Sequence, residues 1–171
     1  IRRRSRSVPI PLSCSQEGLF FLEKLSPGHM TYNEPQVFYL EGALDILILG
    51  ESLDFLIERH EILRTRITEN NGVFSQVVDE PKTGLLNVVD LSDVSEEHRM
   101  DRARELATQL ARQPIDMTKS PMMYVTLFRL SDTQHVLALV LHHIIVDGWS
   151  LEVLMRELST SYNDFKAERS S

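Results

Sequence analysis

The sequence predicts an α+β domain in which about four helices are layered on a mixed, mostly antiparallel sheet. Four segments carry apolar residues at helical spacing, and five or six shorter segments are continuously apolar or alternate between apolar and polar residues. A short turn at 131–134 joins the last two strand segments and makes them antiparallel neighbours. With 171 residues, of which 42% are hydrophobic, the chain can form one domain with a sizeable core.

The composition excludes several functional classes. The net charge of −7 argues against a nucleic-acid-binding protein, because phosphate contacts need clustered lysines and arginines. The only basic cluster, at 2–6, is more typical of a solvated linker than of a nucleic-acid or membrane arm. No stretch approaches the roughly 18 apolar residues that span a bilayer. The one cysteine, Cys14, excludes an internal disulfide and favours a reducing cytoplasm as the location.

The chain is expected to start with an extended lead-in and a short helix. Two prolines spaced by one residue favour extended backbone over residues 1–11. Ser13 or Ser15 can then cap a helix that ends at about Leu25, before the breaker sequence Ser-Pro-Gly. The apolar residues that this helix is expected to bury are Leu19, Phe20, Leu22 and Leu25.

The other elements follow from the same patterns and from turn residues. Asn70-Asn71-Gly72 supplies the left-handed positions of a hairpin turn, and Pro114 ends the third helix. The predicted elements are a loop at 29–35, a strand at 36–40, a helix at 45–62, hairpin strands at 65–68 and 73–78, a strand at 86–89, a helix from Asp93 or Ser95 to Arg112, strands at 123–130 and 135–142, and a helix at 151–165.

The segment 142–150, His-His-Ile-Ile-Val-Asp-Gly-Trp-Ser, is the most unusual part of the chain. It follows the apolar run 136–141, which is typical of a central, buried strand. Polar residues at the end of such a strand cost free energy unless they are hydrogen-bonded or have a function. Because neighbouring strand residues point to opposite faces, His142 and His143 are expected to serve different sides of the sheet.

Two kinds of chemistry are open to this segment. A metal site is disfavoured, because adjacent strand residues do not easily reach one tetrahedral ion and no second ligand cluster exists. A single histidine acting as a base fits better, because histidine titrates near neutral pH. Asp147 would then need a cation or several backbone donors, and Gly148 would allow close backbone approach. Each feature alone is typical of ordinary packing or an ordinary turn, but together they favour a functional site.

Three segments, and a shorter fourth one, carry a resemblance to a known family. Residues 142–150 resemble the His-His-x-x-x-Asp-Gly signature of condensation domains of nonribosomal peptide synthetases, whose shorter core is shared by the chloramphenicol-acetyltransferase-like superfamily. Residues 59–67, Arg-His-Glu-Ile-Leu-Arg-Thr-Arg-Ile, are similar to their Arg-His-Glu-x-Leu-Arg-Thr segment. Residues 12–22 resemble their first motif, although Gly18 stands where that motif has arginine. Tyr32-Asn33-x-Pro35 follows at the expected place.

The resemblance implies a chloramphenicol-acetyltransferase-like fold and an amide-forming acyltransferase. It implies that His143 is the catalytic residue, where an upstream acyl or peptidyl thioester meets a downstream aminoacyl thioester. Both substrates arrive on phosphopantetheine arms of carrier domains, so the domain itself is expected to bind no cofactor. The resemblance leaves open whether His143 is a general base or positions the amine.

The resemblance gives the remaining site residues supporting roles. It implies that Asp147 pairs with Arg64, and bidentate contact with arginine would satisfy the buried acid. Gly148 is expected to keep the turn tight and to present backbone near the oxyanion. His142 is expected to support the fold, and Trp149 to contribute packing.

The resemblance also implies that the chain is one part of a larger assembly. Residues 12–167 would form the N-terminal lobe of a two-lobed domain, with 1–11 as a linker and 168–171 as a tail. The expected partners are upstream and downstream peptidyl carrier domains, the C-terminal lobe and an adjacent adenylation domain. Alone, this lobe is expected to be inactive. The alternatives are a carrier- or coenzyme A-dependent O-acyltransferase of the same superfamily and a non-catalytic lobe that docks carriers.

Overall fold

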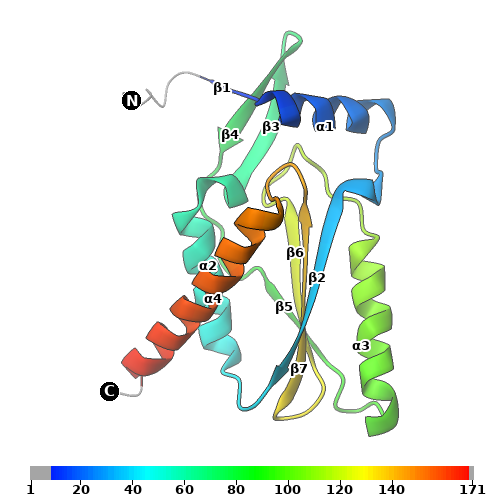
Figure 1. Cartoon of the computed structure of the whole chain (residues 1–171), viewed down its shortest axis with the longest axis vertical. Coiled ribbons are helices and arrows are strands. Elements are labelled where there is room, and N and C mark those ends of the chain that lie inside the picture. The colour runs from blue at the N-terminus through cyan, green and yellow to red at the C-terminus, as the bar shows by residue number, and fades with distance from the viewer. Residues whose placement is uncertain (1–8, 170–171) are drawn as a thin grey trace.

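The computed structural model describes residues 9–169, so the basic cluster at 2–6 lies outside the described residues. The predicted α+β class is confirmed, because this part contains four α-helices and two sheets (Figure 1). The helices are α1 (Cys14–Leu25), α2 (Ile46–Arg59), α3 (Glu96–Ala111) and α4 (Gly148–Arg169), with short 3-10 helices η1 (Met30–Tyr32) and η2 (Glu61–Arg64). The strands are β1 (Ile10–Pro11), β2 (Asn33–Glu41), β3 (Thr65–Asn70), β4 (Val73–Val78), β5 (Leu86–Asp90), β6 (Met123–Arg129) and β7 (Gln134–His142).

The larger sheet has the strand order β2-β7-β6-β5 and is mixed but mostly antiparallel. Strand β7 pairs antiparallel with both β2 and β6, which confirms the predicted pairing of the last two strands. Strand β5 runs parallel to β6. All residues of β7 after Gln134 are buried, as the apolar run 136–141 predicts for a central strand.

Helices cover both faces of this sheet (Figure 1). Helices α2 and α4 lie on one face, and their apolar side chains form the main core with alternate residues of β6 and β7. Helix α3 lies on the other face, where its small residues Ala103 and Ala107 pack in a second cluster with Val136 and Ala138 of β7. The two packed faces explain why β7 is apolar without alternation.

The second sheet, with the order β1-β4-β3, lies at the end of the molecule that carries α1 (Figure 1). The predicted hairpin is confirmed, because Asn71 and Gly72 have φ angles of 51° and 77° in the tight turn between β3 and β4. Ile10 and Pro11 pair with β4, so the extended lead-in ends inside a sheet. Helix α1 packs on the hairpin through Phe20 and Phe74, whose ring centroids lie 4.8 Å apart.

The structure corrects the inward face of α1. Only Phe20 is buried, whereas Leu22 and Leu25 are 45% and 65% exposed. The reason is that α1 crosses one end of the molecule and contacts a narrow hairpin, which covers little of the helix. The cap at Ser13 is confirmed, because its hydroxyl accepts from the Gln16 N–H while the Gln16 side chain accepts from the Ser13 N–H.

Several predicted boundaries also differ from the structure: α2 ends at Arg59 rather than at 62, and α4 begins at Gly148 rather than at 151. Strand β2 starts at Asn33 rather than at 36, because pairing with β7 continues to the Asn33–His142 pair. Helix α4 continues to Arg169, whose guanidinium donates to Glu51, so the first two residues of the expected tail 168–171 are helical.

A polar cluster around Asp79 joins the hairpin to the segment before β6. The Arg66 Nε donates to both oxygens of the Asp79 carboxylate at 3.0 and 3.1 Å, and the Ser120 hydroxyl donates at 2.6 Å. Burial raises the pKa of Asp79, but the hydrogen bonds from Ser120 and Arg66 outweigh it and hold that pKa below its ordinary value. The ionised carboxylate therefore stabilises the folded state.

We predict that Asp79→Asn lowers the free energy of unfolding by about 1 to 2 kcal/mol at neutral pH, because it removes hydrogen bonds to a partly buried charge. The pKa of Asp79 is lower in the folded state than in the unfolded state. Its contribution to stability is therefore fully present above the pKa of the unfolded state and is lost as the pH falls through the pKa of the folded state. The difference between wild type and variant should therefore narrow below about pH 4. Urea unfolding at pH 7 and pH 3 measures both effects.

The matched control is Asp101→Asn, which removes a carboxylate from an exposed pair with Arg104 on α3. Exposed pairs of this kind contribute little, so its unfolding curve should match that of wild type. Equal destabilisation by the two variants would contradict a special role for the Asp79 cluster.

Candidate functional site

The segment singled out in the sequence forms the connection between β7 and α4 (Figure 1). Strand β7 ends at His142, and the Ile145 N–H donates to the His142 carbonyl at 3.0 Å, which turns the chain. Helix α4 begins at Gly148. The short loop 143–147 therefore lies at one end of the larger sheet, on the side where α1 crosses.

His142 is buried and supports the turn. His142 is only 1% exposed, and its Nδ1 accepts from the Ile144 N–H at 3.0 Å. Burial, followed by the charge of His143, lowers the pKa of His142 to about 4. His142 is thus neutral at physiological pH with its proton on Nε2, because Nδ1 acts as an acceptor.

His143 has the opposite environment. Its side chain is 42% exposed, and its Nδ1 lies 3.3 Å from the Glu34 Oε1. Its backbone N–H donates to the Tyr32 carbonyl at 2.8 Å, so the residue just before β2 holds the His143 backbone in place. One histidine is enclosed and the other faces solvent, although His143 lies in the loop after β7 and not in the strand, as the prediction assumed.

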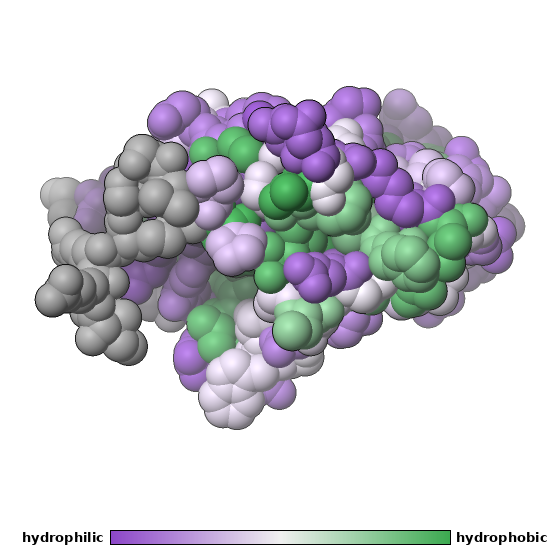
Figure 2. All heavy atoms as spheres, turned by 90° about the horizontal axis from the view of Figure 1, so that it is seen from above, coloured by the Kyte–Doolittle hydropathy of each residue, from purple (hydrophilic) through white to green (hydrophobic). Residues whose placement is uncertain are grey.

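The His143 side chain lines an open hollow with a volume of about 610 Å³. Figure 2 looks onto this end of the molecule and shows apolar side chains in the middle of the face, bordered by hydrophilic ones. The hollow lies between the start of α1, strand β4 and the loop 143–147, and it contains both polar groups and apolar walls. Its lining residues are Ser13, Ser15, Gln16, Leu19, Ile62, Gln76, His143, Ile144, Ile145, Val146, Asp147 and Ser150.

Gln16 connects two walls of the hollow, and sequence reasoning did not single it out. Its Nε2 donates to the Ile144 carbonyl at 3.4 Å and to the Gln76 Oε1 at 3.3 Å. It also completes the capping box of α1. Its place in the segment 12–22 was the only signal available, because the contact with Ile144 joins residues far apart in the chain.

The predicted pair of Asp147 and Arg64 is wrong. Asp147 is exposed, and its Oδ1 accepts from the Ser150 N–H at 2.8 Å and from the Ser150 hydroxyl at 2.6 Å. These two bonds hold the pKa of Asp147 below its ordinary value, and the bond from the Ser150 hydroxyl has the larger effect. Asp147 therefore caps the first turn of α4, and an exposed carboxylate needs no buried cation.

Arg64 points to a different part of the molecule. Its Nη1 donates to the Asp79 carbonyl at 2.6 Å, and its Nη2 donates to the Glu58 carbonyl at 3.5 Å. The 3-10 helix η2 ends at Arg64 and turns its side chain toward the base of the hairpin. Arg64 thus ties η2 to the end of β4, beside the Asp79 cluster.

The structure also changes the expectations for Gly148 and Trp149. A methyl group added to Gly148 would meet no atom within 4 Å, so the local backbone does not require glycine. Trp149 is 78% exposed, which contradicts its expected packing role. Both residues lie at the exposed start of α4, where few side chains surround them.

The described residues contain no group of three or more His, Cys, Asp or Glu side chains arranged to hold a metal ion. Among the same residues, no helix has the length and apolar character needed to cross a membrane.

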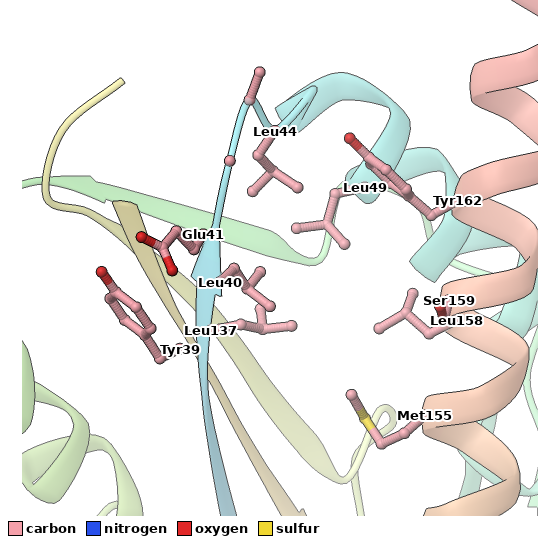
Figure 3. A pocket seen from close by; sticks show the side chains of 12 residues that line it. Tyr39, Leu40, Glu41, Leu44, Leu49, Leu137, Met155, Leu158, Ser159 and Tyr162 are labelled. Atoms are coloured by element: carbon pink, nitrogen blue, oxygen red, sulfur yellow. The ribbon is translucent and has the colours of Figure 1, made fainter. Parts of the chain in front are cut away.

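A second cavity, of about 370 Å³, lies between β2 and α4 and is mainly apolar (Figure 3). Leucine side chains line one side of the cavity, and side chains of α4 line the other. The leucines are Leu40, Leu44, Leu49 and Leu137, and the facing residues of α4 are Met155, Leu158 and Tyr162. The Tyr162 hydroxyl accepts from the Asp45 N–H at 2.9 Å, which anchors the far end of α4 to the start of α2. No residue of the segment 142–150 lines this cavity, so it is separate from the histidine site.

We predict that the effects of Asp147→Ala and Arg64→Ala on stability are additive, because the two side chains share no contact. Thermal and urea unfolding of both single variants and the double variant give the coupling between them. A coupling energy typical of a direct ion pair would contradict the separate environments described here. Asp147→Asn, which keeps the capping acceptor, should be less destabilising than Asp147→Ala.

Comparison with known proteins agrees with the motifs. The family model described as "Condensation domain" matches residues 7–171. The chain is 39% identical over 164 residues to a linear gramicidin synthase of Brevibacillus parabrevis, and the match covers 96% of this chain but 3% of that protein. It is 38% identical over 162 residues to chondramide synthase cmdD of Chondromyces crocatus, which covers 95% of this chain and 4% of that protein.

Solved structures show the same fold. The starter condensation domain of rhizomide synthetase RzmA matches with a TM-score of 0.86 at 20% identity, over 94% of this chain and 40% of that chain. The first condensation domain of the CDA synthetase matches with a TM-score of 0.86 at 21% identity, over 95% of this chain and 42% of that chain. The chain thus spans less than half of these domains. It belongs to the condensation-domain family of nonribosomal peptide synthetases.

Proposed function

We propose that this chain is the N-terminal lobe of a condensation domain that joins a carrier-bound acyl or peptidyl donor to a carrier-bound aminoacyl acceptor. The observation that carries this proposal is the environment of His143. Of the two histidines in the signature, His142 is enclosed and neutral, whereas His143 faces an open hollow. Of these two histidines, only His143 is therefore accessible to a substrate.

The proposed reaction is the aminolysis of a thioester. The acceptor amine attacks the donor carbonyl carbon, a C–N bond forms, and the C–S bond then breaks. The nitrogen loses a proton, and the departing sulfur of the donor arm gains one. A neutral imidazole can accept the proton from nitrogen or can hold the amine in line through a hydrogen bond. In both cases, His143 must present a nitrogen lone pair to the hollow.

The supporting residues have simpler roles in this proposal. His142 fixes the turn that carries His143, through its bond with the Ile144 N–H. Asp147 caps α4 and thereby holds the other end of the same loop. Gly148 is the proposed source of a backbone N–H for the oxyanion, since the first N–H groups of a helix are free to bind anions. Arg64 stabilises the lobe at a distance from the hollow.

The proposed partners follow from the same reaction. Upstream and downstream carrier domains deliver both substrates on phosphopantetheine arms, so the lobe needs no bound cofactor. A C-terminal lobe would form the opposite wall of the hollow, and an adjacent adenylation domain would supply the acceptor. The coverage of 40% and 42% of the solved domains supports a two-lobed parent. The exposed thiol of Cys14 supports a reducing cytoplasm as the proposed location.

We predict that His143→Ala, made in a synthetase that contains this condensation domain, lowers the rate of amide formation by about 10²- to 10⁴-fold if the ring acts as the base. Carriers loaded with donor and acceptor, analysed by mass spectrometry after rapid quenching, give this rate. The control is His98→Ala, because His98 is exposed on α3 and distant from the loop 143–147. An unchanged rate for His143→Ala, with correct folding, would refute the proposed function.

We also predict that the 171-residue chain alone forms no amide from loaded carriers, because the hollow is open to solvent on the side where the proposed C-terminal lobe would lie. Product at the rate of the intact domain would show that one lobe is sufficient. Addition of a separately expressed C-terminal lobe offers a direct complementation test.

A further inference from the structure

Glu34 is the only described side chain that makes a polar contact with the His143 ring. Its position follows from the pairing of β2 with β7, in which Asn33 lies opposite His142 and Glu34 opposite Leu141. Asn33 points to the α3 face, where its Nδ2 donates to the carbonyls of Ala111 and Gln113. Because side chains alternate along a strand, Glu34 points to the opposite face and reaches His143.

Two residues act on the same histidine, Tyr32 just before β2 and Glu34 within it. The Tyr32 carbonyl accepts from the His143 N–H at 2.8 Å and fixes its backbone. The Glu34 Oε1 lies 3.3 Å from the His143 Nδ1, within ion-pair distance of the ring. The first contact acts on the backbone of His143 and the second on Nδ1, so neither occupies the other ring nitrogen, Nε2.

A carboxylate can only accept hydrogen bonds, so the His143 nitrogen that faces it must carry the proton. This leaves the lone pair on Nε2. We propose that Glu34 is a positioning residue that sets the tautomer and orientation of His143, so that Nε2 presents its lone pair to the acceptor amine. The inference rests on the proposed function and adds a residue from outside the signature 142–148 to the site. The same arrangement of carboxylate and imidazole orients the base in other acyl-transfer enzymes.

Two alternatives are weaker. Asp147 is the other carboxylate close enough to influence His143 electrostatically, but its Oδ1 already accepts from the Ser150 N–H and hydroxyl. A purely stabilising ion pair is also disfavoured, because the side chains of His143 and Glu34 are 42% and 43% exposed. Pairs with such exposure contribute little to folding. We therefore expect the contact to act on the tautomer and orientation of the His143 ring rather than on folding stability.

The first test measures the tautomer in the 171-residue chain itself. Two-bond ¹H–¹⁵N correlation spectra of ¹⁵N-histidine-labelled protein, in alkaline buffer where free imidazole is neutral, distinguish the protonated ring nitrogen from the one with the lone pair. We expect His143 to carry its proton on Nδ1 in wild type and in Glu34→Gln, which keeps an acceptor oxygen. In Glu34→Ala the proton should move mainly to Nε2.

The control variant is Glu41→Ala, because Glu41 lies at the far end of β2 on its other face. The His143 signals of this variant should match those of wild type. Wild-type protein with the proton on Nε2, or no change in Glu34→Ala, would overturn the positioning role.

The second test measures amide formation in the synthetase that contains this domain. Glu34→Ala should lower kcat at least about tenfold, part of the 10²- to 10⁴-fold effect of a general base, while KM for the acceptor carrier changes little. Glu34→Gln should restore most of the rate. In a His143→Ala background, Glu34→Ala should cause no further loss, because Glu34 acts through the ring.

These outcomes separate the two proposals. If His143→Ala retains full activity, the proposed function fails, whatever the tautomer of His143. If His143→Ala loses activity while Glu34→Ala retains it, the proposed function stands and the positioning role of Glu34 is wrong.

Discussion

The antiparallel pairing of β2 with β7 is the constraint on which the site depends. It runs without a break from Asn33–His142 to Glu41–Gln134. Strand β7 is packed on both faces, so its register is strongly specified. A slip of one residue would turn Glu34 toward α3 and Asn33 toward the hollow. The burial of a strand in the centre of the sheet thus determines which side chain reaches His143.

Around this rigid strand, the two ends of the loop 143–147 are fixed by different interactions. His142 holds the first end from inside the protein, with its Nδ1 bonded to the Ile144 N–H. Asp147 holds the second end from the surface by capping α4. His143 lies between them and stays accessible. The loop that carries His143 is therefore held at both ends, although the His143 side chain itself is exposed beside a mainly apolar core.

The sequence predicts those features that depend on local patterns. The apolar run 136–141, the turn at Asn71-Gly72 and the cap at Ser13 are each decided by neighbouring residues, and the structure confirms them. Contacts between distant residues were not accessible in this way. The Glu34–His143 contact needs the register of β2. The Asp147–Arg64 pair, which only the resemblance implies, is absent from the described contacts because Asp147 is exposed at a helix start and is satisfied by Ser150.

The carbonyl of Tyr32, the residue just before β2, accepts from the His143 N–H, and this bond extends the contact between β2 and β7 into the loop 143–147. Amide hydrogen exchange of the 171-residue chain tests it most directly, since the His143 N–H lies beyond the last residue of β7. We expect this amide to be protected to a similar degree as the amides of β7. If the His143 amide exchanges at the rate of an unstructured peptide while the amides of β7 stay protected, the hydrogen bond to the Tyr32 carbonyl is contradicted.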